Sequence, residues 1–127
     1  MQNQKSAIGL DGNLTALIGY IIGIIALIEI FIEKDNKFVR FHAIQAVLFH
    51  VVFWISFIVV WIVGGILVFA ISAASTGLGW ILGLLLTLIL LVVFFGGLIG
   101  LIYAAIKAYQ GVTFKLPIVG SMAEKWT

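Results

Sequence analysis

The sequence predicts an all-α integral membrane protein. We expect a bundle of three transmembrane helices, with four as the alternative, followed by a short amphipathic interfacial helix. Of the 127 residues, 64% are hydrophobic and only 9% are charged, whereas a soluble domain averages about 25% charged residues. The apolar runs are also long enough to cross a bilayer, which takes about 20 helical residues. A soluble fold of this composition would have almost no polar surface.

The first expected span covers residues 14–32 and follows a polar tail, residues 1–13. Its small residues Thr15, Gly19 and Gly23 recur every four positions. This spacing places them on one helix face, where they allow a second helix to approach closely. An ordinary bilayer helix with incidental glycines explains the pattern equally well.

The second and third expected spans, residues 43–74 and 80–106, are separated by a short polar stretch without charge. The second run is longer than one untilted crossing needs, so its helix either tilts or begins at the interface. The third contains small residues four apart, and we expect its closest helix contact along them: Gly96, Gly100 and Ala104.

The C-terminal segment, residues 111–127, changes character. Pro117 is tolerated in the first turn of a helix, and the apolar residues after it recur at helical spacing. The segment therefore predicts a short amphipathic helix at the membrane surface, with a disordered tail as the alternative. Its apolar positions are Ile118, Val119, Met122 and Trp126.

The basic residues predict an orientation. Six of the seven lie in the first loop or after the third span, and cytoplasmic segments are enriched in such residues. We therefore expect the first loop and the C-terminus in the cytoplasm, the N-terminus outside, and a prokaryotic plasma (inner) membrane as the location. The six are Lys34, Lys37, Arg40, Lys107, Lys115 and Lys125.

This orientation brings several polar residues to one membrane level, and we expect them to form a cluster at the cytoplasmic interface. A buried ionised carboxylate is costly, so Glu29 should be paired, protonated or near the headgroups: it either reaches water there or faces the bundle and pairs with Arg40 or Lys107. His42 and Gln45 are three residues apart and share a helix face. The candidate cluster is Glu29, Arg40, His42, Gln45 and Lys107.

Little in the sequence indicates chemistry. Without cysteine there is no disulfide or thiolate metal site, and no nucleophile or phosphate-loop motif is present. For His42 and His50 a structural hydrogen bond is favoured over a metal site. The small net charge of +2 does not indicate nucleic-acid binding. We expect no enzyme activity and no cofactor.

The stretch from Lys37 to Gln45 (KFVRFHAIQ), with the ending KLPIVG at residues 115–120, resembles the Tic-twenty-like family of small prokaryotic membrane proteins. That family is similar to a component of the chloroplast inner-envelope import translocon. The resemblance implies a helical membrane bundle and, by analogy, a role in protein translocation.

Three functions remain as hypotheses. The first is a non-enzymatic interaction or accessory subunit of a membrane complex, in contact with the lipid bilayer and forming a homo-oligomer or a larger assembly. The second is an oligomeric channel or transporter, including a translocation component, with Glu29, His42, Gln45 and His50 lining a polar path. The third, a membrane enzyme using His42 and Glu29, ranks last.

Overall fold

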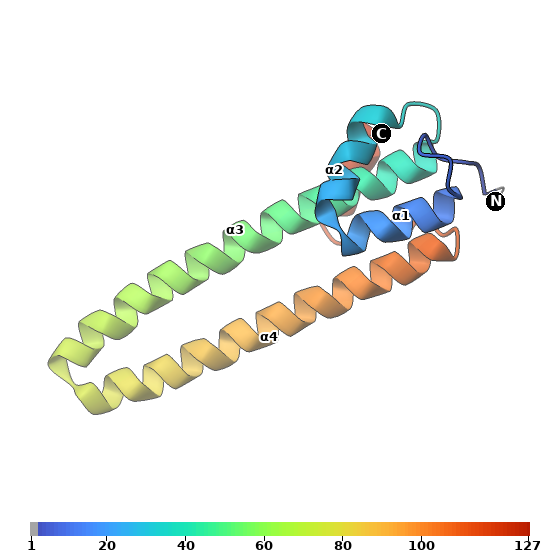
Figure 1. Cartoon of the computed structure of the whole chain (residues 1–127). Coiled ribbons are helices and arrows are strands. Elements are labelled where there is room, and N and C mark those ends of the chain that lie inside the picture. Colours follow the sequence, from blue (N-terminus) through green and yellow to red (C-terminus); the bar gives the residue numbers. More distant parts are fainter. Residues whose placement is uncertain (1–2) are drawn as a thin grey trace. The chain divides into compact units, whose positions relative to one another are not determined.

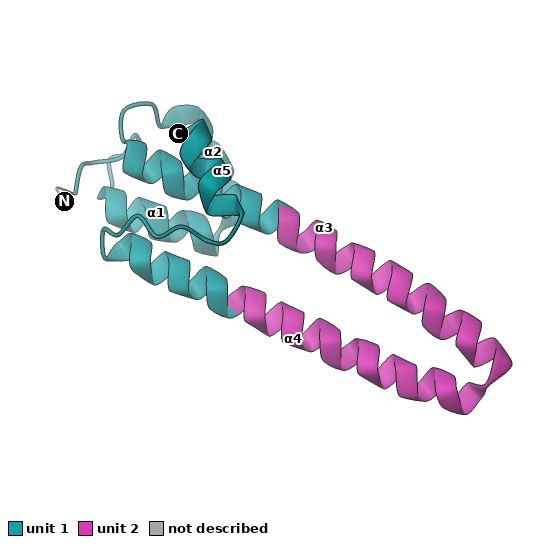
Figure 2. Cartoon of the chain, turned by 180° about the vertical axis from the view of Figure 1, so that it is seen from behind, with its two compact units in different colours: residues 1–51, 99–127 teal, residues 52–98 magenta. Residues whose placement is uncertain are grey.

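The computed structural model describes residues 3–127, which are helical apart from turns and connecting segments (Figure 1). The chain divides into two units, coloured separately in Figure 2: unit 1 runs up to Val51 and resumes at Ile99, and unit 2 covers Val52–Leu98. The expected all-α class is confirmed for the described residues. The helices are α1 (Gly12–Ile21), α2 (Gly23–Ile32), α3 (Lys37–Ala74), α4 (Thr76–Tyr109) and α5 (Val119–Trp126).

Unit 2 is an antiparallel pair formed by the second part of α3 and the first part of α4, joined at Ser75 (Figure 1). No charged residue occurs between positions 52 and 98. Each helix contributes 23 residues to the unit, or about 34 Å at 1.5 Å per residue. This matches a hydrocarbon core about 30 Å thick. Both helices are long and apolar enough to cross a membrane.

The two helices of unit 2 approach each other at glycines. A Cβ on Gly64 would collide with the side chain of Leu86, and one on Gly97 would overlap the ring of Phe53. By contrast, Gly96, which was expected to mark the closest contact, faces open space, and so does Gly100. The approach uses Gly97, one residue along the helix and about 100° around it.

The first expected span is not one continuous helix. The backbone leaves helical geometry at Ile22, where φ is −119° and ψ is 91°, and two ten-residue helices result. Each is about 15 Å long and too short to cross a bilayer. The expectation of an unbroken helix over residues 14–32 was therefore wrong, because α1 and α2 pack on each other and against α3 and α4 within unit 1.

The core of unit 1 is built mainly from alanines, which bring its helices close together. Tyr20 is the largest apolar side chain fully enclosed there, and the expected small residue Ala104 is also fully buried. The buried members of this cluster are Ala16, Tyr20, Ala26, Ala43, Ala46, Ala104, Ala105, Ala108, Leu116 and Val119.

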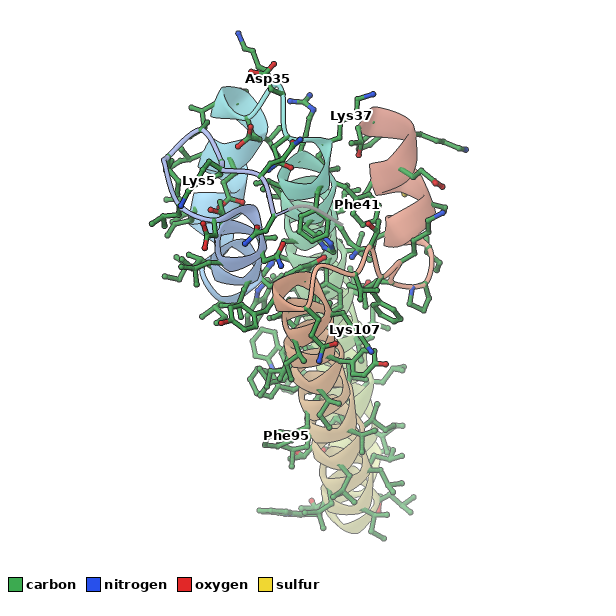
Figure 3. The ribbon with its side chains drawn as sticks, turned by 90° about the vertical axis from the view of Figure 1, so that its right-hand side faces the viewer. Lys5, Asp35, Lys37, Phe41, Phe95 and Lys107 are labelled. Atoms are coloured by element: carbon green, nitrogen blue, oxygen red, sulfur yellow. The ribbon has the colours of Figure 1, made fainter. Side chains whose placement is uncertain are left out.

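Helix α5 completes unit 1 and forms within the predicted C-terminal segment. Phe41 of α3 packs against Ala123, and Figure 3 shows its ring between α3 and α5. Val119 is buried as well, whereas Ile118 and Trp126 remain 79% and 57% exposed. The apolar positions identified from the sequence therefore divide between the core and the surface.

Candidate functional site: a buried polar network in unit 1

Three buried side chains from α1 and α3 form a hydrogen-bonded chain. Gln45 Nε2 lies 2.6 Å from the Tyr20 hydroxyl, which lies 2.8 Å from His42 Nδ1. Because the amide nitrogen can only donate, the hydroxyl accepts from Gln45 Nε2 and donates its own proton to His42 Nδ1. His42 is thereby held as a neutral ring with its proton on Nε2. Both His42 and Gln45 are fully buried.

Gln45 also anchors the segment that leads into α5. Its Nε2 donates to the Phe114 carbonyl at 2.9 Å, and its Oε1 accepts from the Leu116 amide at 2.8 Å. These contacts fix the orientation of the amide group, since each end meets a partner of the right kind. A Cβ on Gly120 would lie only 2.7 Å from Oε1. One side chain therefore joins α1, α3 and the C-terminal segment.

The ring of His42 is enclosed by aromatic side chains. Phe38 and Phe41 meet it edge-on, with ring centroids 4.5 and 5.1 Å away. Its Nε2 is buried without a hydrogen bond of normal geometry among the described residues, and the backbone of Val112 is the polar group that interacts with it. The environment is that of a structural histidine.

Glu29 on α2 is a buried polar residue outside this hydrogen-bonded network. It is only 2% exposed, and neither carboxylate oxygen has a hydrogen-bond partner within residues 3–127. Burial, with a smaller share from the charge of Glu33, raises the pKa of Glu29 to about 8. A buried carboxyl without a counter-ion favours its neutral form.

The cations expected to pair with Glu29 lie elsewhere. Arg40 Nη1 donates to the carbonyl oxygens of Ile30 and Glu33, at 2.9 and 3.0 Å, and so caps the C-terminal end of α2. Lys107 lies over the ring of Tyr103, 5.4 Å from its centroid. The structure brings Tyr20, His42 and Gln45 together and leaves Glu29, Arg40 and Lys107 outside their network.

His50 is held within its own helix. Its Nδ1 lies 2.7 Å from the Ala46 carbonyl, one turn earlier in α3. A Cβ on Gly23 would meet the His50 ring at 3.5 Å, an ordinary van der Waals distance, so the start of α2 lies beside this ring. His50 and His42 thus occupy separate environments, and no group of three or more candidate metal ligands occurs among the described residues.

The N-terminal segment is tied to the first loop and to the end of α4. The Gln4 carbonyl accepts from Asn36 Nδ2 at 3.1 Å, and the Ala7 amide donates to Glu33 at 2.7 Å. Asn13 Nδ2 donates to the Tyr109 carbonyl at 3.1 Å. These bonds hold the N-terminal segment beside the first loop, whereas the expected topology, with the N-terminus outside and the first loop in the cytoplasm, would separate the two by a bilayer.

Sequence reasoning identified His42 and Gln45 but missed Tyr20, which bridges them. The available signal was an aromatic residue carrying a hydroxyl within a run of aliphatic ones, because a buried Tyr usually bonds through that group. It also missed the backbone partners at Phe114 and Leu116, which no side-chain pattern reveals.

Comparisons with known proteins place the chain in a membrane-protein family. A UPF0132 membrane protein of Methanocaldococcus jannaschii is 33% identical over 97% of this chain and 94% of its own. A second one from that organism is 30% identical, covering 94% and 73%. One from Archaeoglobus fulgidus is 34% identical, covering 90% and 89%. No solved structure matches the chain significantly.

The family model that matches extends over residues 4–123. It overturns the resemblance to the Tic-twenty-like family, because the motif at Lys37–Gln45 falls within a different family. A short stretch of aromatic, basic and amide residues at a helix start was insufficient to distinguish the two. The chain belongs to the magnetosome magnetite crystal formation protein family, MamF/MmsF.

Proposed function

We propose that the protein is a non-enzymatic membrane subunit that acts through contacts with lipid and with other membrane proteins. The observation that carries this proposal is the segregation of charge. All seven basic and all five acidic residues belong to unit 1, and unit 2 has none. The apolar side chains of unit 2 are largely exposed, so lipid or another apolar helix has to cover them.

The same segregation supports a two-span topology. In this proposal unit 2 crosses the bilayer as a helical hairpin, and unit 1 lies at one interface. All seven basic residues then share a side, which is the cytoplasmic side by the positive-inside rule. The outer face of α2 fits an interfacial position, since Ile24, Ile28 and Phe31 are between 51% and 72% exposed.

The buried polar network favours a structural role over catalysis or transport. Both the nitrogen and the oxygen of the Gln45 amide form hydrogen bonds within unit 1, and His42 is enclosed by aromatic rings. A polar path would need such groups to face water. The family description names magnetite crystal formation, and the archaeal relatives are named only as membrane proteins. We carry over only the membrane location that the names of these relatives state.

Cross-linking tests the proposal, because the chain has no cysteine of its own. We would place a single cysteine at Gly96, which faces open space, and a control at Leu91, which is 47% exposed and about 140° around α4. Oxidation in native membranes should link the first variant selectively, and native mass measurement should give a complex. A monomer with no cross-link at either position would contradict the proposal.

A further inference from the structure

Glu29 differs from the other glutamates and from the paired aspartate of unit 1. Glu33 accepts from the amides of Ala7 and Asn36. Asp11 pairs with Lys5 at 2.6 Å, and Glu124 with Lys115 at 2.8 Å. Glu29 is buried, and neither of its oxygens is bonded within the described chain. The fold therefore encloses one carboxyl group that no residue from 3 to 127 neutralises.

The surroundings of Glu29 are small and apolar. A Cβ on Gly19 of α1 would lie 2.9 Å from Oε2 and 3.3 Å from the Ala26 Cβ. The carboxyl group is thus pressed against the α1 backbone at the point where only glycine allows the approach. This close packing leaves the group little freedom to turn toward water.

Three titratable or charged groups on the elements around α2 have other partners. Tyr20 of α1 bonds His42 and Gln45. From α3, Arg40 bonds two backbone carbonyls of α2, and His50 bonds Ala46. Glu33, one turn along α2, adds a like charge. An ionised Glu29 would therefore be a buried charge without compensation, which is strongly destabilising.

We propose that Glu29 is a proton-binding site: its carboxyl group holds a proton while α1 and α2 are packed, and loss of that proton loosens the pair. The O–H bond breaks, the proton passes to water, and the negative charge stays on the two oxygens against Gly19. The loosening occurs at Ile22, the single non-helical residue joining the helices. The inference stands independently of the oligomeric role proposed above.

Isotope labelling provides a direct test, since the chain has only three glutamates. We would label the side-chain carboxyl carbons with ¹³C in the full-length protein and follow their resonances from pH 4 to pH 10. Glu29→Gln, which preserves size, identifies the Glu29 resonance, and Glu124→Gln identifies an exposed one. If Glu29→Gln fails to fold, Glu124→Gln and Glu33→Gln identify it by elimination.

The Glu29 resonance should keep the chemical shift of a protonated carboxyl at neutral pH and titrate near pH 8. Amides of α1 and α2 should lose hydrogen-exchange protection over the same range in the wild type but not in Glu29→Gln. Titration near the ordinary value of about 4.3 would overturn the proposal. The proposal would also be overturned if sodium or potassium chloride lowered the titration midpoint and choline chloride did not, because a metal ion would then be the ligand.

Discussion

Replacing Gln45 by leucine tests whether the buried network holds unit 1 together. The change removes three hydrogen bonds, to the Tyr20 hydroxyl, the Phe114 carbonyl and the Leu116 amide. Each is worth about 1 kcal/mol net, rising to about 1–3 kcal/mol where the lost bond leaves its buried partner unsatisfied. Some regained apolar contact offsets part of this loss. We expect the free energy of unfolding to fall by about 3–5 kcal/mol.

The measurement is a reversible unfolding titration in detergent micelles, with Gln110→Leu as the control. Gln110 is exposed, so the same chemical change there should cost less than about 0.5 kcal/mol. Combining Gln45→Leu with Tyr20→Phe should cost less than the sum of the single changes, because the two residues share a bond. Equal effects of Gln45→Leu and Gln110→Leu would refute the reasoning.

Three further predictions use the same titration. Gly97→Ala should lower the free energy of unfolding by about 1–3 kcal/mol, because the added Cβ overlaps the Phe53 ring. Gly96→Ala is the control and should not lower it, because the added Cβ meets nothing within 4 Å. A larger loss from Gly96→Ala than from Gly97→Ala would contradict the packing of unit 2. Burial raises the pKa of Glu29 from 4.5 to about 8, so wild-type stability should be full below pH 4.5 and fall as the pH rises to about 8. A Glu29→Gln curve parallel to the wild type would exclude Glu29 as the cause. Ile118 has φ of 68° in a turn closed by a hydrogen bond from the Val119 amide to the Pro117 carbonyl. Glycine adopts this φ without strain, so Ile118→Gly should raise the free energy of unfolding by about 1 kcal/mol. A lower free energy of unfolding would mean that the exposed Ile118 side chain contributes packing that outweighs the strain.

The helical membrane class followed from composition, because a chain with long uncharged apolar runs has few other ways to satisfy its backbone. The break at Ile22 did not follow from the sequence, since neither Ile22 nor Gly23 is a strong helix breaker in an apolar run. Tyr20 and Glu29, on either side of the break, are both buried inside unit 1. Hydropathy measures the transfer of a side chain from water to an apolar medium. Both the core of unit 1 and the bilayer are such media, so hydropathy alone does not tell a helix of that core from a transmembrane helix.

The polar cluster was predicted only in part. His42 and Gln45 stood out as polar residues at the start of an apolar helix, and they do form a buried pair around Tyr20. The sequence left three possibilities for Glu29: pairing with a cation, protonation, or a place near the headgroups. Sequence patterns do not distinguish pairing from protonation, because the outcome depends on which cations are already bonded elsewhere.

The side of the membrane on which the N-terminus lies distinguishes the two topologies. We would place single cysteines at Lys5, whose side chain is 70% exposed, at Thr76, the first residue of α4, and at Lys125. Two spans place Lys5 and Lys125 on one side and Thr76 on the other, whereas three spans place Lys5 with Thr76. An impermeant maleimide added to intact cells should therefore label Thr76→Cys alone. Labelling of Lys5→Cys from outside would require the bond between Gln4 and Asn36 to be broken in the membrane, and would restore the three-span topology.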